Sequence, residues 1–147
     1  TGRRKKRLNF KPKRKGRNFL NDKILADTSV WIEFFKAGSG IGDVFASLVS
    51  TNSVVTCGIV LFELMQGIKS DKEKSIILNA ISELPYIEMD SSLWQKSAVL
   101  AASLRRKGIT LPLSDIFIAA IALEHNLSIF TLDKHFDDIP GITIYKP

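Results

Sequence analysis

The chain has 147 residues, of which 45% are hydrophobic and 24% are charged, a composition that suits one domain with a sizeable core. Its apolar stretches fall well short of the roughly 20 residues that a membrane-spanning helix needs, and its first residues are basic, unlike a secretory signal. The single cysteine, Cys57, cannot form an internal disulfide. We therefore expect a soluble, cytoplasmic protein with no membrane partner.

The net charge of +6 is divided unevenly along the chain. Residues 1–23 hold eleven Lys and Arg residues against one acid, Asp22, so this arm carries +10 and the remainder carries −4. The arm has few apolar residues and no amphipathic period, which predicts disorder. It is either a phosphate-seeking arm for nucleic acid or a solvated leader or cloning remnant. We accordingly divide the chain into a basic arm, residues 1–23, and one domain, residues 24–147.

Strands and helices alternate after the arm. The apolar run at 23–27 predicts a strand, and Thr28 or Ser29 would cap a following helix that Gly38 ends. Further strands are expected at 53–57, 86–89, 127–133 and 141–146, and further helices at 41–50, 58–68, 71–84, 93–107 and 111–126. The 93–107 helix follows a cap-like Asp90-Ser91-Ser92 and carries an expected apolar stripe of Leu93, Ala98, Ala101, Ala102 and Leu104. This alternation predicts an α/β fold, a parallel sheet flanked by helices on both faces.

Four acids fall where such a sheet gathers its ligands, beyond the carboxyl ends of the strands. Asp27 and Asp133 end the first and fourth predicted strands, Glu63 lies in the apolar helix after the second strand, and Asp115 opens the helix at 111–126. Converging carboxylates repel one another unless a cation lies among them, and Mg²⁺ or Mn²⁺ prefers oxygen ligands. The sequence therefore predicts an acidic site for a divalent metal.

A metal in that position suits the hydrolysis of a phosphodiester, because it neutralises charge on the phosphate and lowers the pKa of a bound water. Asp27, Glu63 and Asp115 would be ligands directly or through water, and Asp133 would position the attacking water or complete the metal shell. The expected products are a 5′-phosphate and a 3′-hydroxyl. The chain has no Ser-His-Asp order, no GxxxxGK[ST] loop and no paired CxxC, which argues against serine hydrolases, P-loop NTPases and structural zinc sites.

Four blocks of sequence carry a family resemblance: ILADTSVWIEFF (24–35), VVTCGIVLFELMQG (54–67), LPLSDIFIAAIAL (111–123) and IFTLDKHFDDIPGI (129–142). In this order they resemble the signature blocks of PIN-domain ribonucleases, and in particular the VapC-type toxins of toxin–antitoxin pairs. The resemblance runs from Ile24 to about Tyr145.

The resemblance implies a PIN-like parallel sheet flanked by helices and an endoribonuclease that depends on Mg²⁺ or Mn²⁺. It assigns the catalytic and metal-binding roles to Asp27, Glu63, Asp115 and Asp133, with Thr131 and Thr28 in support. It also implies an RNA substrate such as tRNA or rRNA, a homodimer, and a VapB-type antitoxin whose tail occupies the acidic groove.

Two positions depart from the family pattern. His135 stands where many members carry a further acid, and Cys57 stands where a serine often precedes the glutamate. We interpret His135 as a surface or packing residue rather than a base. Arg105 and Arg106 close a helix, where they either suit its dipole or contact RNA.

Two alternative functions stay open at this point. A metal-dependent phosphatase of the haloacid-dehalogenase type also places an aspartate after its first strand, but it expects DxDxT, and residue 29 is serine. A non-catalytic nucleic-acid-binding or scaffold protein would keep the fold and rely on the arm.

Overall fold

The structure, a computed structural model, describes residue 20 and residues 22–147, so nearly all of the predicted arm lies outside the described residues. The described part contains one five-stranded parallel sheet with the strand order β3-β2-β1-β4-β5. Its elements are β1 (Ile24–Ala26), α1 (Thr28–Phe34), α2 (Gly40–Ser50), β2 (Val54–Cys57), α3 (Gly58–Met65), α4 (Asp71–Ser82), β3 (Tyr86–Ile87), α5 (Ser91–Arg106), α6 (Leu113–His125), β4 (Ser128–Phe130), the 3₁₀ helix η1 (Lys134–Asp138) and β5 (Thr143–Ile144).

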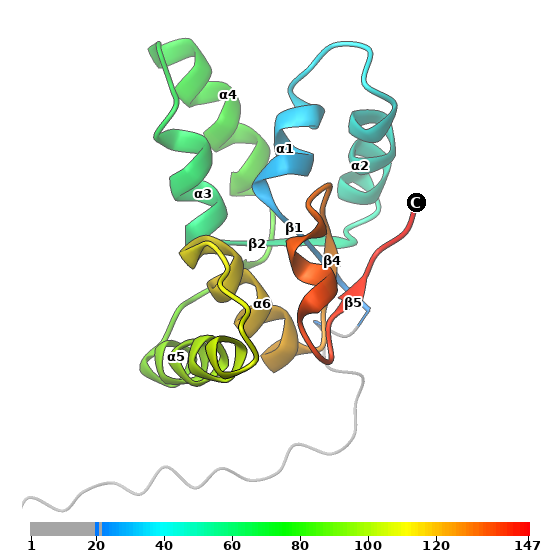
Figure 1. The fold of residues 1–147 in the computed structure, drawn as a ribbon. Coiled ribbons are helices and arrows are strands. Elements are labelled where there is room, and N and C mark those ends of the chain that lie inside the picture. The colour runs from blue at the N-terminus through cyan, green and yellow to red at the C-terminus, as the bar shows by residue number, and fades with distance from the viewer. Residues whose placement is uncertain (1–19, 21) are drawn as a thin grey trace, which may run out of the picture.

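Strand β1 lies at the centre of the sheet. Leu25 pairs with Val55 of β2 on one side and with Ile129 of β4 on the other. Helices α1 to α4 gather on one side of the sheet, and α5 and α6 lie on the other (Figure 1). The segments that follow β1 and β4 therefore leave the same edge of the sheet side by side, although about a hundred residues separate them in sequence.

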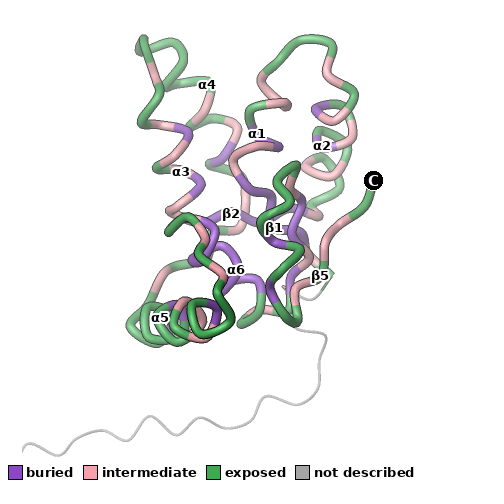
Figure 2. The backbone as a smooth tube through the Cα atoms, in the orientation of Figure 1, coloured by how far each residue is buried: buried purple, intermediate pink, exposed green. Residues whose placement is uncertain are grey.

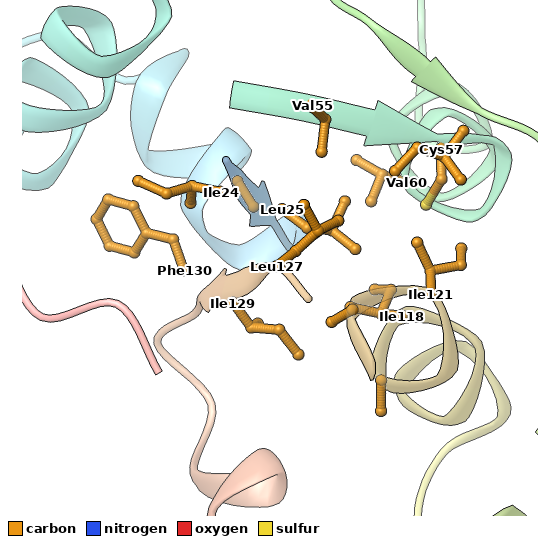
Figure 3. Packing of buried hydrophobic residues seen from close by; sticks show 14 of the residues in the cluster. Ile24, Leu25, Val55, Cys57, Val60, Ile118, Ile121, Leu127, Ile129 and Phe130 are labelled. Atoms are coloured by element: carbon orange, nitrogen blue, oxygen red, sulfur yellow. The ribbon is translucent and has the colours of Figure 1, made fainter. Parts of the chain in front are cut away.

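Burial of the sheet on both faces explains why the sequences of its central strands are mainly apolar. All residues of β1 and β2 are buried, as expected for a parallel sheet that is covered on both faces. Helix α6 is buried along its whole stretch from Asp115 to Ala122, so it is the innermost helix of its layer (Figure 2). Its Ile118 and Ile121 pack with Leu25 in the buried cluster of Figure 3. This rigid centre carries the first turn of α6 and the end of β1, where two of the predicted acids lie.

The order of elements and the predicted fold class are confirmed, but several local predictions are wrong. Asp27, not Thr28 or Ser29, caps α1: its backbone is extended and its carboxylate accepts the Ser29 N–H. Helix α1 ends at Phe34, and Gly38 adopts φ +75° in the loop beyond it. Strand β4 ends at Phe130, so Asp133 lies three residues past the strand, at the start of η1.

The predicted apolar stripe of α5 is also partly wrong. Ala98 and Ala102 are exposed, and the buried residues of this helix are Leu93, Ser97 and Leu104. Ser97 is tolerated on the buried face because its hydroxyl donates to the Leu93 carbonyl 2.7 Å away. None of the helices in the described part of the chain has the length and apolar character of a membrane span.

Candidate acidic active site

Asp27 is the central acid of the candidate site. It directly follows β1, donates its backbone N–H to the Phe130 carbonyl at 3.0 Å, and is only 3% exposed. Its Oδ1 accepts hydrogen bonds from the Ser29 N–H at 3.0 Å and from the Ser29 hydroxyl, and its Oδ2 accepts one from the Thr131 hydroxyl at 2.5 Å. The carboxylate is thus held in one orientation by α1 on one side and by the segment after β4 on the other.

The segment between β4 and η1 brings Asp133 to the same edge. Its backbone is tied to the two hydroxyls that hold Asp27: the Leu132 N–H donates to the Ser29 hydroxyl at 3.1 Å, and the Asp133 N–H donates to the Thr131 hydroxyl at 2.9 Å. Asp133 itself is exposed, so it lies at the rim of the site rather than in its floor.

Asp115 lies in the first turn of α6 and is 7% exposed. Its Oδ2 lies 2.9 Å from Nδ1 of His135, a residue of η1 whose side chain is half exposed. Our sequence interpretation of His135 as a surface or packing residue missed this contact. The signal that could have found it is its position two residues after Asp133, where the family pattern carries an acid.

Glu63 lies near the C-terminal end of α3 and approaches the site from the side of the sheet that carries α1 (Figure 1). Its Oε1 accepts a hydrogen bond from the Thr28 hydroxyl at 2.9 Å, and Thr28 is the residue next to Asp27. Both side chains line a cleft of about 420 Å³ between α1, α3 and α4, whose walls are otherwise mainly apolar. Glu63 is therefore half-buried at the boundary between an apolar cleft and the acidic edge.

The carboxylates act on one another electrostatically. Burial raises the pKa of Asp27, and the carboxylate of Asp133 raises it further, against hydrogen bonds from Ser29 and Thr131 that lower it. Burial also raises the pKa of Asp115, and Asp133 and Asp27 add to this, against the hydrogen bond and charge of His135, which lower it. The structure thus brings Asp27, Asp115 and Asp133 within electrostatic reach of one another, whereas Glu63 is joined to them through Thr28.

Comparison with known protein families places the chain that carries these acids, because the model of the PIN domain matches residues 24–142. The chain belongs to the PIN-domain family. Ribonuclease VapC11 of Mycobacterium tuberculosis is 30% identical over 125 residues, which cover 82% of this chain and 93% of that protein. Ribonuclease VapC1 of Methanocaldococcus jannaschii is 28% identical over 127 residues, covering 84% of this chain and 87% of that protein.

A solved structure of a VapBC complex has the same fold as this chain. The crystal structure of DNA-bound VapBC from Salmonella typhimurium superimposes with a TM-score of 0.73 at 26% identity, and the match covers 84% of this chain and 96% of that chain. The predicted resemblance to PIN-domain ribonucleases of the VapC type is therefore confirmed, and the haloacid-dehalogenase alternative is wrong.

The donor chemistry of this PIN domain fits a hard divalent cation. Among residue 20 and residues 22–147, no three His, Cys, Asp or Glu side chains are already grouped as a metal cage. Mg²⁺ does not require such a cage, because it keeps several waters and is commonly bound by one or two carboxylates together with substrate phosphate. Asp27 and Asp115 meet that requirement, because both are buried carboxylates whose pKa is raised by burial and by the charge of Asp133.

The two predicted RNA contacts, Arg105 and Arg106, lie on α5, a helix that carries none of the four acids. Arg105 and Arg106 are exposed in the last turn of α5, and in the described part of the chain neither forms an ion pair. Arg105 lines a small pocket with Leu113 and Ile116 of α6, the helix that also carries Asp115. Their contact with RNA stays a prediction.

Proposed function

We propose that this PIN domain hydrolyses RNA phosphodiester bonds with Mg²⁺ or Mn²⁺ held by Asp27 and Asp115, and that Glu63 and Asp133 complete the site. The observation that supports this most directly is the burial of two carboxylates, Asp27 and Asp115, at the same edge of the sheet. A protein interior does not gather such groups without a compensating charge.

The residues divide the work according to their positions. When bound, the cation supplies charge neutralisation at the phosphate and a water of lowered pKa. Asp27 and Asp115, the buried pair, would hold it in place. Asp133 at the rim and Glu63 at the cleft would complete the site by accepting hydrogen bonds from water, and the exposed carboxylate of Asp133 would orient the attacking water. Because water rather than a ribose hydroxyl attacks, the cut ends are a 5′-phosphate and a 3′-hydroxyl.

The protein acts, in this proposal, as the toxin of a toxin–antitoxin pair with a VapB-type antitoxin, works as a homodimer and has tRNA or rRNA as its substrate. Support for the antitoxin comes from the related Salmonella typhimurium structure, a VapBC complex. The mainly apolar cleft between α1, α3 and α4 opens beside Glu63, so a partner segment bound there would reach the acidic edge.

The test is incubation of the purified protein with total RNA in EDTA, in Mg²⁺ and in Mn²⁺, followed by mapping of the new ends. We expect cutting only with a divalent ion, 5′-phosphate ends, and loss of cutting in Asp27→Asn with an unchanged circular dichroism spectrum. Cutting in EDTA would overturn the metal proposal. RNA binding without cutting by the wild-type protein would instead support the non-catalytic alternative.

A further inference from the structure

Ser29 makes more contacts at the acidic edge than any role as a helix residue requires. It is the second residue of α1 and is half-buried. Its N–H and its hydroxyl both donate to Oδ1 of Asp27, and the same hydroxyl accepts the Leu132 N–H at 3.1 Å. One small side chain therefore joins the start of α1, the central acid and the segment after β4.

The hydrogen bonds leave the two oxygens of Asp27 in different states. Each oxygen of an ionised carboxylate has about two lone-pair positions. On Oδ1 both positions are used by Ser29, whereas on Oδ2 only one is used, by the Thr131 hydroxyl. A single position on Oδ2 remains for a further partner.

Ser29 and Thr131 also form a matched pair. Each hydroxyl donates to one oxygen of Asp27 and accepts one backbone N–H from the segment that leads to Asp133. The position of Asp133 relative to Asp27 is thus fixed by two short bridges instead of by the loop's own stiffness.

We propose that Ser29 is a positioning residue that makes Asp27 a one-oxygen ligand through Oδ2 and holds Asp133 in register with it. This inference rests on the proposed function, because it assumes that Asp27 meets a cation. Without the Ser29 hydroxyl, one lone-pair position of Oδ1 becomes open to the cation while the Ser29 N–H still occupies the other, and the Leu132 N–H loses its acceptor. Both changes loosen the geometry on which the attack of water depends.

The experiment compares Ser29→Ala, which removes the hydroxyl, with Ser29→Thr, which retains it. The affinity of the full chain for Mn²⁺ is measured without RNA by the loss of the free-ion electron paramagnetic resonance signal, and kcat and KM are measured on one RNA substrate. We expect Ser29→Ala to lower kcat and weaken Mn²⁺ binding by about 10- to 100-fold, the usual effect of removing a group that orients a metal ligand, with little change in KM. Ser29→Thr should keep most of the wild-type kcat and most of the wild-type affinity for Mn²⁺.

Amide hydrogen exchange of the wild-type protein tests the proposal even if Ser29→Ala does not fold. The amide hydrogens of Leu132 and Asp133 should exchange with solvent well below the rate of an unprotected loop amide, and in Ser29→Ala the Leu132 amide should lose this protection while the Asp133 amide keeps part of it. Unprotected Leu132 in the wild type would overturn the proposal, as would wild-type kcat and Mn²⁺ affinity in Ser29→Ala.

The variant Asp27→Asn distinguishes a failure of the role proposed for Ser29 from a failure of the proposed function. If Asp27→Asn loses cutting and Ser29→Ala does not, the positioning role fails and the proposed function stands. If Asp27→Asn still cuts RNA, the proposed site itself is wrong, and the role of Ser29 fails with it.

Discussion

Nδ1 of His135 lies 2.9 Å from Oδ2 of Asp115, joining η1 to the first turn of α6 across the candidate site. The contact lowers the pKa of a carboxyl that burial raises, so His135 favours the ionised form of Asp115. A histidine at the rim of the site thereby stabilises the charge of one of its two buried acids.

Replacement of His135 should shift the pH dependence of RNA cutting. In His135→Ala the pKa of Asp115 loses its lowering contact and rises further, so a larger share of Asp115 is protonated at a given pH. We expect the acid limb of RNA cutting to be displaced to higher pH, measured as log kcat against pH at one fixed Mg²⁺ concentration for both proteins. The matched control is His125→Ala, because His125 is the last residue of α6, at the helix end opposite Asp115. An acid limb that stays in place would show that His135 does not act on Asp115.

Neutralising Asp115 should stabilise the metal-free protein. The folded-state pKa of Asp115 is raised, so the folded state binds more protons than the unfolded state at pH values between the two pKa values, and stability falls as the pH rises through this window. Asp115→Asn has no carboxyl to ionise, so it avoids this loss of stability. Its Tm in EDTA should exceed the wild-type Tm by roughly 2–4 °C at neutral pH, and this difference should narrow as the pH falls through the window and close below the unfolded-state pKa of about 4.

Added Mg²⁺ should reverse the order of the two Tm values, so that the wild-type protein melts at the higher temperature. A cation that binds only the folded state raises the Tm more when it binds more tightly, and in this proposal Asp115→Asn lacks one of its ligands. Differential scanning fluorimetry in EDTA and in Mg²⁺ reads both effects. Equal responses of both proteins to Mg²⁺ would exclude Asp115 as a ligand.

The sequence predicted the sheet and the acids better than the bonds between them. Strand and helix order follow from local apolar patterns, and the carboxyl-edge rule for parallel sheets places Asp27 without knowledge of the contacts. The Ser29–Leu132 bond spans 103 residues and depends on β1 lying beside β4, which no local pattern encodes. The sequence predicted the end of β4 at Asp133 instead of Phe130 for the same reason. The Thr131 hydroxyl bonds Asp27 directly after β4 ends, and no local pattern encodes that long-range contact.

The bond between Thr28 and Glu63 gives a prediction for α3. Thr28→Val removes the hydroxyl that donates to Glu63 Oε1 and keeps the shape of the side chain, so Glu63 gains freedom to turn into the cleft. We expect kcat to fall about 10-fold, the lower end of the effect of losing a residue that orients a metal-site group, while stability changes by about 1 kcal/mol or less. RNA cleavage rates and urea unfolding measure the two quantities.

Two controls make the Thr28 result specific. Thr28→Ser keeps the hydroxyl and should keep most of the activity, whereas Thr143→Val makes the same chemical change at an exposed position of β5 and should have no effect. If Thr28→Val cuts RNA at the wild-type rate, Glu63 does not need this bond to serve the site.

Deletion of residues 1–19 tests the role predicted for the basic arm and leaves in place Lys23, whose ammonium contacts the Asn52 carbonyl. The deleted segment holds ten Lys and Arg residues and no acid. If these residues contact RNA phosphates, the truncated protein should bind a non-cleavable single-stranded RNA more weakly, and the slope of log K against log salt should become shallower by about 0.7 for each lost contact. Cutting of saturating RNA should persist, because the acids lie outside the arm. Unchanged affinity and slope would identify the segment as a solvated leader, and loss of cutting at saturating RNA would show that the domain depends on it.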